Sequence, residues 1–263
     1  MTIAKQLGLT VAKLRPLGDI DRPEDLGLWL QYRLKTPDIP KVSVIIPTLN
    51  EAKHIKDTLL SLMPSPVEVI VVDGGSKDET IEIAQSLGVK VMKTNPPRAK
   101  QMNLGATVAQ GDILLFLHGD TKVPPQFLSH IMINLAKPGV VAGAFLLEIA
   151  EQQWELNLVS RGANLRSTIC QLPYGDQGIF LTKSQFEQIG KFPEIAIMED
   201  FTLIKKLQTH GKIAIASTAV TTSARRWQRL GIIKTTIVNQ LIIIGYYSGI
   251  DPDRLAHWYR HIK

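Results

Sequence analysis

The chain has 263 residues, of which 44% are hydrophobic and 21% are charged. Both fractions are close to the average for globular domains, which excludes an intrinsically disordered chain, a collagen-like repeat and a disulfide scaffold. The formal net charge of +6 is unevenly distributed, because residues 221–263 hold seven Lys or Arg against two Asp. The preceding 220 residues, with 23 basic and 22 acidic side chains, are nearly neutral.

The first residues and the single cysteine indicate a cytoplasmic protein. Lys5, Lys13 and Arg15 interrupt the apolar residues near position 1, so we expect no signal peptide there. Cys170 has no partner for an internal disulfide bond, as is usual in a reducing compartment.

Strand and helix periods alternate from residue 41 onwards, after an N-terminal extension over residues 1–40 with one predicted helix at residues 26–34. Apolar runs predict strands, and apolar positions three or four residues apart predict helices. The predicted strands cover residues 42–46, 67–72, 89–93 and 112–117, with helices over residues 50–63, 76–88 and 98–109 between them. Such alternation is typical of βαβ units. The sequence therefore predicts an α/β fold with a mostly parallel sheet flanked by helices.

Two of these helices carry capping signals at their starts. Asn50 is a favourable N-cap residue for the first helix, whose apolar face is predicted to run from Ile55 to Met63. Ser76 and Glu79 have the spacing of a capping box, in which each side chain bonds to the other residue's backbone amide.

Beyond residue 117 the pattern is less regular. The predicted elements there are a helix at 124–136, strands at 140–149, 179–181 and 213–216, and helices at 184–189 and 200–210. Trp154 is predicted to be a core residue, which is the commoner use of tryptophan. We expect one domain over residues 41–220, with halves at 41–122 and 123–220, and a basic, apolar helical tail over residues 221–263.

The tail contains an apolar segment, residues 232–250, which Lys234, Asn239 and Gln240 interrupt. A spanning helix needs about 20 predominantly apolar residues. A transmembrane helix, an interfacial amphipathic helix and a helix packed on the domain therefore all stay open. The basic neighbours suit an anionic surface, so we expect peripheral contact with the inner face of the membrane. No nucleic-acid partner is expected, because such proteins usually spread their basic residues along a recognition element.

Polar loops follow all four of the first predicted strands, at residues 47–51, 73–76, 94–95 and 118–120. In an open parallel sheet, ligands bind at the carboxyl ends of the strands. The glycine-rich signatures of nicotinamide dehydrogenases and P-loop ATPases do not occur in the chain. A nucleotide bound at these loops would therefore be held by side chains and a metal ion.

These loops resemble those of the family 2 glycosyltransferases, which have the GT-A fold, a Rossmann-like fold of nucleotide-diphospho-sugar transferases. The resemblance covers residues 41–227 and is closest to the small soluble members. It is carried by residues 44–51 (VIIPTLNE), 71–78 (VVDGGSKD) and 98–106 (RAKQMNLGA), by the Asp-x-Asp-like residues 118–120 (HGD), and by residues 198–200 (MED).

The resemblance implies a role for each half of the predicted domain. Residues 41–122 would bind a UDP- or GDP-sugar donor and residues 123–220 the acceptor, a sugar or lipid hydroxyl group. Asp200 would be the catalytic base, with Glu199 as the second candidate. The implied donor-binding residues are Pro47, Thr48, Asn50, Glu51, Asp73, Gly75, Arg98, Lys100, Asn103, His118 and Asp120. The implied acceptor-binding residues are Tyr174, Gly175, Asp176, Gln177, Arg226 and Trp227.

The Asp-x-Asp-like motif also implies a divalent cation. Asp120 would hold the cation against the donor diphosphate, and His118 is a second candidate ligand. Because His118 replaces the first acid of the motif, and imidazole suits Mg²⁺ less well than carboxylate does, Mn²⁺ is favoured over Mg²⁺. A bound cation and basic side chains such as Arg98 would neutralise the charge of a departing nucleoside diphosphate.

The predicted activity is therefore a single, inverting sugar transfer. Larger processive members of the family carry Gln-x-x-Arg-Trp, whereas residues 223–227 (SARRW) keep only the Arg-Trp pair. Two alternatives stay open. One is a nucleotidyltransferase, although such enzymes usually have a glycine-rich segment where residues 47–51 have none. The other is a non-catalytic protein that binds membranes or nucleic acid through the basic tail.

Overall fold

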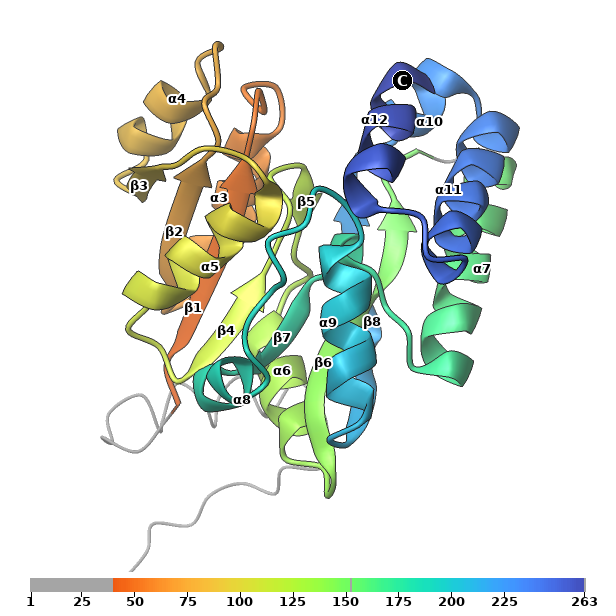
Figure 1. Cartoon of the computed structure of the whole chain (residues 1–263). Helices are drawn as coiled ribbons and strands as arrows, with labels where there is room; N and C mark the ends of the chain where they lie inside the picture. Colours follow the sequence, from red (N-terminus) through yellow and green to blue (C-terminus); the bar gives the residue numbers. More distant parts are fainter. Residues whose placement is uncertain (1–39, 152, 263) are drawn as a thin grey trace, which may run out of the picture. The chain divides into compact units, whose positions relative to one another are not determined.

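The computed structural model describes residues 40–151 and 153–262, and in these residues eight strands form one sheet (Figure 1). Apart from Pro40, the predicted N-terminal extension and its helix at residues 26–34 lie outside the described residues. The strand order is β3-β2-β1-β4-β7-β6-β8-β5. The strands are β1 (Val42–Thr48), β2 (Glu68–Asp73), β3 (Lys90–Lys93), β4 (Ile113–Phe116), β5 (Thr121–Lys122), β6 (Val140–Ile149), β7 (Ile179–Thr182) and β8 (Lys212–Thr222).

Six of these strands point the same way, and β5 and β7 run against them. The pairs β1–β2, β2–β3, β1–β4 and β6–β8 are parallel. This arrangement confirms the predicted α/β fold with a mostly parallel sheet. Because β1, β2 and β4 are parallel neighbours, their carboxyl ends, and the loops that follow them, lie at one edge of the sheet.

Helices cover both faces of the sheet. Ile45 of β1 packs with α5, α8 and α9, whereas its neighbours Val44 and Ile46 pack with α3, α4 and α6. Alternate strand residues point to opposite faces, so the apolar run of β1 supplies both cores. The six helices are α3 (Ile55–Leu62), α4 (Thr80–Ser86), α5 (Arg98–Val108), α6 (Phe127–Leu135), α8 (Lys183–Gln188) and α9 (Glu199–Gln208).

The predicted tail forms three helices that pack on the same compact unit, α10 (Arg225–Leu230), α11 (Ile232–Tyr247) and α12 (Pro252–Ile262). Val238 of α11 and Leu255 of α12 pack with Phe201 of α9. One face of α11 is therefore buried, as the packing alternative predicts. None of the described helices has the length and apolar content needed to span a membrane.

The two predicted helix caps do not form. The first helix begins after His54, and Met63 is 49% exposed beyond its end. Asn50 instead has a φ of +57°, and its side chain accepts a hydrogen bond from the backbone of a neighbouring loop. The next helix begins after Glu79, which makes no side-chain cap bond. The hydroxyl group of Ser76 instead accepts a bond from Asn50 N in the loop after β1 and donates to Asp73 in its own loop. Both predictions were wrong because the loops use these side chains to bind each other.

The sequence patterns also missed the long helix α7 (Trp154–Cys170). Its buried positions are Leu156, Ser160 and Ser167, so its inner face is short of large apolar residues. The prediction that Trp154 lies in the core was wrong, since its side chain is 68% exposed. A shorter segment that the patterns did not predict is β5.

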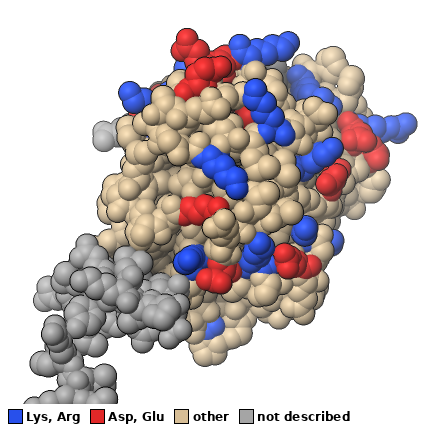
Figure 2. All heavy atoms as spheres, turned by 90° about the vertical axis from the view of Figure 1, so that its left-hand side faces the viewer, with Lys and Arg blue, Asp and Glu red and all other residues tan. Residues whose placement is uncertain are grey.

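Charges are mixed on the side of the molecule that carries β3 and α4. Figure 2 shows basic and acidic side chains interspersed on that face. This pattern agrees with the near neutrality of the first 220 residues. The basic excess belongs to the last 43 residues.

Candidate active site

A cavity of about 310 Å³ opens beside the carboxyl ends of β1 and β4. Its walls come from the loops after these strands, from the 3₁₀ helix η1 (Gly175–Gln177), and from the end of β8 with α10. Predicted site residues from distant parts of the sequence therefore share one cavity. The polar or aromatic lining residues are Asn50, His118, Asp120, Asp176, Thr222, Ser223, Arg225, Arg226, Trp227 and Arg229.

Asp73 organises the loop after β2. Its carboxylate accepts hydrogen bonds from the backbone amides of Gly75 and Ser76, both at 2.8 Å. It also accepts bonds from the hydroxyl groups of Ser76 and Thr48. Gly75 permits the turn, because its φ of +101° lies in a region that other residues rarely adopt. The carboxylate is completely buried, so it fixes the shape of this loop.

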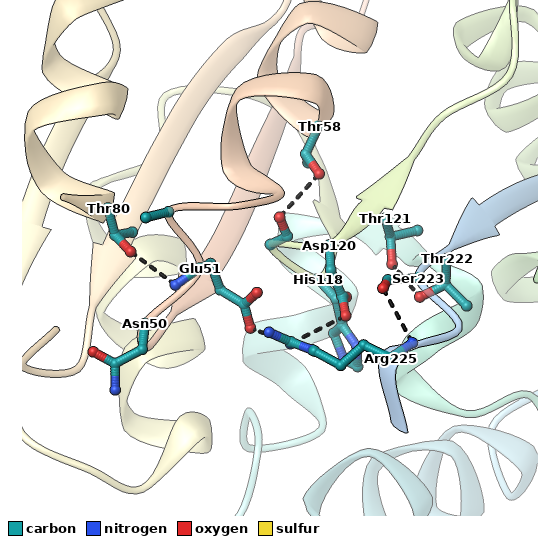
Figure 3. A network of polar contacts seen from close by, with 12 residues as sticks. Asn50, Glu51, Thr58, Thr80, His118, Asp120, Thr121, Thr222, Ser223 and Arg225 are labelled. Atoms are coloured by element: carbon teal, nitrogen blue, oxygen red, sulfur yellow. Dashed lines mark hydrogen bonds and ion pairs between the residues drawn. The ribbon is translucent and has the colours of Figure 1, made fainter. Parts of the chain in front are cut away.

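Arg225 joins the loops after β1 and β4. Its guanidinium group lies 2.6 Å from Glu51 Oε1 and 3.2 Å from Asp120 Oδ2 (Figure 3). The other oxygen of Glu51 is buried and has no hydrogen-bond partner among the described residues. Burial raises the pKa of Glu51, although its hydrogen bond from Arg225 opposes the shift. Two carboxylates thus share one arginine at the cavity wall.

Gly119 allows this close arrangement. A Cβ atom at this position would lie 3.1 Å from Glu51 Cγ and 3.2 Å from Thr48 Cγ2. Its carbonyl oxygen accepts a bond from Thr58 Oγ1 at 2.9 Å, which ties the loop to α3. The middle position of the Asp-x-Asp-like motif is therefore restricted by Thr48, at the end of β1, and by Glu51, in the loop after it.

A second ionic group surrounds Arg98 at the start of α5. Arg98 Nε donates to Glu199 Oε1 at 2.6 Å, and Arg98 Nη1 lies 3.0 Å from His118 Nε2. Burial opposes the charge of Arg98, but Glu199 and Asp200 outweigh it and raise the pKa of the guanidinium group. Burial, together with the charge of Arg98, lowers the pKa of His118 well below its usual value. The imidazole is therefore neutral, and its Nε2 accepts a hydrogen bond from Arg98 Nη1.

Asp200 lies in the first turn of α9 and is held by the backbone. Gly175 N donates to Asp200 Oδ2 at 2.6 Å, and Phe201 N donates to Asp200 Oδ1 at 2.7 Å. A Cβ atom on Gly175 would lie only 2.9 Å from Asp200 Oδ2 and 3.1 Å from His118 Nε2. The absence of a side chain at Gly175 thus lets the carboxylate and the imidazole approach the same point.

Asp176 brings a further carboxylate to the cavity wall. Burial raises its pKa, although the charges of Arg226 and Arg166 oppose the shift. Next to it, Arg166 lies over the ring of Tyr174, 3.5 Å from the ring centroid. Tyr174 is thereby fixed at the edge of η1 by a cation–π contact.

Trp227 closes the cavity on the side of α10. Its ring packs against Leu156 of α7 and Ile232 of α11. Its Nε1 is buried without a hydrogen-bond partner among the described residues. A buried donor of this kind costs about 1–3 kcal/mol while it stays unpaired, so it favours a ligand that accepts its bond.

Several predicted site residues have other partners or lie apart. Lys100 is exposed on α5, and its ammonium group makes no hydrogen bond or ion pair among the described residues. Asn103 exchanges two hydrogen bonds with the backbone of Phe192. Gln177 is completely buried and donates to the carbonyl oxygen of Phe145 at 3.0 Å. Pro47 is buried within β1. None of these four residues lines the cavity. Its lining also lacks other predicted site residues, namely Thr48, Glu51, Asp73, Gly75, Arg98, Tyr174, Gly175, Glu199 and Asp200.

The sequence did not indicate Arg225 and Gln101, nor the lining residues Thr222, Ser223 and Arg229. Gln101 Nε2 donates to Thr48 O at 2.8 Å and to Val72 O at 2.9 Å, which joins the ends of β1 and β2. It lies against Gly74, where a Cβ atom would be 2.8 Å from Gln101 Nε2. The position of Gln101 within the resemblance to family 2 was the only available signal. For Arg225 the signal was its place beside the Arg-Trp pair.

The carboxylates of the site fit a divalent cation that shares its ligands with a substrate. The described residues contain no group of three His, Cys, Asp or Glu side chains arranged to hold a metal ion. Small divalent cations are commonly held by one or two carboxylates together with substrate phosphates and water. Asp120 and the unpaired oxygen of Glu51 provide such ligands. A cation at His118 Nε2 would instead have to displace Arg98.

A protein-family model, described as Glycosyl transferase family 2, matches residues 43–185. The chain belongs to this family. Among curated proteins, it is 29% identical over 213 residues to the probable glycosyltransferase YdaM of Bacillus subtilis, covering 69% of this chain and 50% of that protein. The chain spans half or less of the length of the first curated relatives that it matches.

Solved structures of glycosyltransferases share the fold of this family member. Glucosyl-3-phosphoglycerate synthase from Mycobacterium tuberculosis, solved with Mn²⁺, UDP and glucosyl-3-phosphoglycerate, has a TM-score of 0.58 at 21% identity, covering 88% of this chain and 85% of that one. The mannosyltransferase PcManGT from Pyrobaculum calidifontis, solved with GDP-Man and Mn²⁺, has a TM-score of 0.57 at 21% identity, covering 91% of this chain and 77% of that one. The GT-A fold expected from the sequence is confirmed.

Proposed function

We propose that this family 2 glycosyltransferase transfers one sugar from a nucleoside-diphosphate sugar to a hydroxyl group, with inversion at the anomeric carbon. The observation that carries the proposal is the meeting of Asp120, Arg225 and Arg226 in one cavity with His118 and Asp176. A diphosphate needs positive charge, and an attacking hydroxyl group needs a base. Arginines line this cavity, and the carboxylate of Asp200 lies behind its wall, bonded to Gly175 next to the lining residue Asp176.

Arg225 would bind the diphosphate, together with a divalent cation held by Asp120. Such a cation would supply Lewis-acid stabilisation of the departing diphosphate. In the absence of a donor, Arg225 neutralises Glu51 and Asp120. The two solved neighbours hold UDP or GDP-Man together with Mn²⁺, which supports a nucleotide-sugar donor and favours Mn²⁺ here. The loop fixed by Asp73 would meet the base and ribose.

Asp200 would be the catalytic base. Glu199 is less suitable, because its side chain is 3% exposed and is paired with Arg98. Asp200 would take the proton of the acceptor hydroxyl group while the acceptor oxygen forms a bond to the anomeric carbon. The bond from that carbon to the diphosphate oxygen breaks, and the diphosphate leaves with the electron pair. Attack opposite the leaving group inverts the anomeric centre. A positioned base typically contributes a factor of about 10²–10⁴.

The acceptor would lie between η1 and α10. Asp176 and Arg226 line this side of the cavity, and Trp227 offers the unpaired Nε1 hydrogen. Tyr174, held by Arg166, provides an aromatic edge beside them. These groups suit a hydroxylated acceptor, either a sugar or the head of a lipid. The tail would reach the inner face of the membrane from the cytoplasm.

Calorimetric titration of UDP and GDP tests the donor site. We expect one diphosphate to bind in the presence of Mn²⁺, and to bind at least about tenfold more weakly with a chelator or in Asp120→Ala. Asp57→Ala, which removes an exposed carboxylate on α3, is the matched control and should bind as the wild type does. Absence of binding by both diphosphates would overturn the proposed function. Equal affinity in Asp120→Ala and the wild type would refute the role of Asp120.

A further inference from the structure

Large apolar side chains on the surface of the described residues gather on two helices. Fifteen such side chains are exposed, and nine of them belong to α7 and α11. Scattered exposed apolar residues are common, but a group of this size marks an interaction site. We call six of them, each more than half exposed, the two-helix apolar surface: Leu158, Leu165 and Ile169 on α7, with Ile233, Ile237 and Leu241 on α11.

Helix α11 has two apolar faces. Val238 and Ile242 are buried with residues of α9 and α12. Ile233, Ile237 and Leu241 follow at four-residue intervals, so they share another face, which is exposed. Contacts within the protein therefore bury only one of the two apolar faces of α11.

Helix α7 has the reverse of the usual pattern for a surface helix. Two of its three buried positions are Ser160 and Ser167, whereas Leu165 and Ile169 are exposed. A helix that only covers a domain normally turns its large apolar residues inward. Helices α7 and α11 are in contact, and Figure 1 shows both at the side of the molecule away from β3. Their exposed stripes belong to neighbouring helices.

The charged residues on α7, α10 and α11 themselves are almost all positive. Arg161 on α7, Arg229 on α10 and Lys234 on α11 are exposed. Glu155 is the sole acidic residue within these three described helices. The face around β3 and α4 has mixed charges instead. Apolar side chains flanked by Lys and Arg are typical of helices that lie in the interface of an anionic bilayer.

We propose that the two-helix apolar surface docks the protein on an anionic lipid bilayer. The apolar side chains would enter the interface, and Arg161, Arg229 and Lys234 would meet the headgroups. A second copy of the chain fits less well, because it would bring the same basic side chains together, and like charges disfavour such contacts. The docking extends the membrane contact of the tail to α7 and does not depend on the transferase reaction.

The position of this surface links it to the cavity. Arg229 and Leu230 line the cavity, and α11 begins two residues after Leu230. Trp227, at the cavity wall, packs on Ile232 at the start of the same helix. A protein docked through α7 and α11 therefore holds the α10 side of its cavity beside the headgroups.

Vesicle co-sedimentation of the full chain tests the docking. The probes are phosphatidylcholine vesicles, alone and with about one third phosphatidylglycerol, at low and high salt. We expect binding to the anionic vesicles, and at least about tenfold weaker binding in the variant Ile237→Glu with Leu241→Glu. Leu60→Glu, a matched control at an exposed site on α3, should bind as the wild type does. Arg161→Ala with Lys234→Ala should weaken anionic binding roughly 20–30-fold.

The outcomes distinguish a lipid bilayer from a second copy of the chain as the partner of the two-helix apolar surface. Thermal unfolding and diphosphate affinity should be unchanged in the two-glutamate variant, since both positions are exposed. Equal vesicle binding by this variant and the wild type would overturn the proposal, as would a wild type that binds neither vesicle. A dimer that the two glutamates convert to a monomer, without vesicle binding, would assign the surface to a second copy. Vesicle binding without nucleotide binding would refute only the proposed function.

Discussion

The two halves of the sheet position their functional side chains in different ways. Beside β1 and β2, the bonds join residues that are close in sequence or in adjacent loops, such as those of Asp73 to Gly75 and Ser76. Between the two halves, ion pairs join distant segments. Arg98 meets Glu199 across 101 residues, and Arg225 meets Glu51 across 174 residues.

The two halves therefore contribute differently: one fixes the conformation of the loops, and the other brings the charged groups to the cavity. The loops of the parallel half keep their form through buried bonds that need only β1, β2 and α5. The charged groups of the cavity come into place only when η1, α9 and α10 have packed. Substitutions in the first set should therefore act mainly on stability, and those in the second set mainly on turnover and binding.

The largest effect is expected for Asp200→Asn. Without a base, turnover should fall by a factor of about 10²–10⁴, while diphosphate affinity stays within about threefold, because Asp200 would act on the acceptor. Turnover is measured as release of nucleoside diphosphate from the donor that calorimetry identifies. If Glu199→Gln lost turnover while Asp200→Asn kept it, the two residues would exchange roles.

Arg225→Gln should change two affinities in opposite directions. Loss of a charged hydrogen bond to the diphosphate should weaken UDP or GDP binding about 10–100-fold. Mn²⁺ alone should bind more tightly, because Glu51 and Asp120 lose their shared positive partner. Both are measured by calorimetry. Arg254→Gln on α12, also an exposed arginine, is the control and should change neither affinity. Weaker binding of Mn²⁺ in Arg225→Gln would contradict competition between the arginine and the cation.

Gln101→Ala tests whether buried hydrogen bonds stabilise the loops of the parallel half. The substitution removes the side-chain amide that donates to the carbonyl oxygens of Thr48 and Val72. The free energy of unfolding should fall by about 2–3 kcal/mol, measured by urea denaturation. Gln85→Ala removes an exposed glutamine on α4 and should change the free energy of unfolding by less than about 0.5 kcal/mol. An equal effect of both substitutions would show that the loops do not depend on this bridge.

The sequence predicted the parallel half well, because its signals are local. The predicted strands at residues 42–46, 67–72, 89–93 and 112–117 agree with β1, β2, β3 and β4. In the other half, the strand predicted at residues 140–149 agrees with β6. Helix α7 was missed because burial and hydropathy oppose each other along it. Ser167 is buried and Leu165 is exposed, so periodicity alone could not indicate which face meets the protein.

The site was predicted in part, through the resemblance to family 2. It led to Asp120, His118 and Trp227, which the fold brings to one cavity. It could not predict that Asn103 and Gln177 bond within the protein, because a motif does not specify hydrogen-bond partners. The bridge made by Arg225 depends on the packing of α10, which no local pattern encodes.

Asp176→Asn should give the smallest effect, with a sign that depends on pH. Burial raises the pKa of Asp176, so its ionised form is less favourable in the folded protein than in the unfolded chain. That cost is fully present above the raised pKa and disappears as the pH falls below the ordinary value, about 3.9. The variant should therefore be slightly more stable than the wild type at pH 7, and the difference should shrink on acidification and vanish near about pH 3. Urea denaturation at both pH values measures it, with Asp57→Asn as the control. If the variant were less stable at pH 7, Arg226 and Arg166 would outweigh burial, and Asp176 would hold the cavity together as their counter-ion.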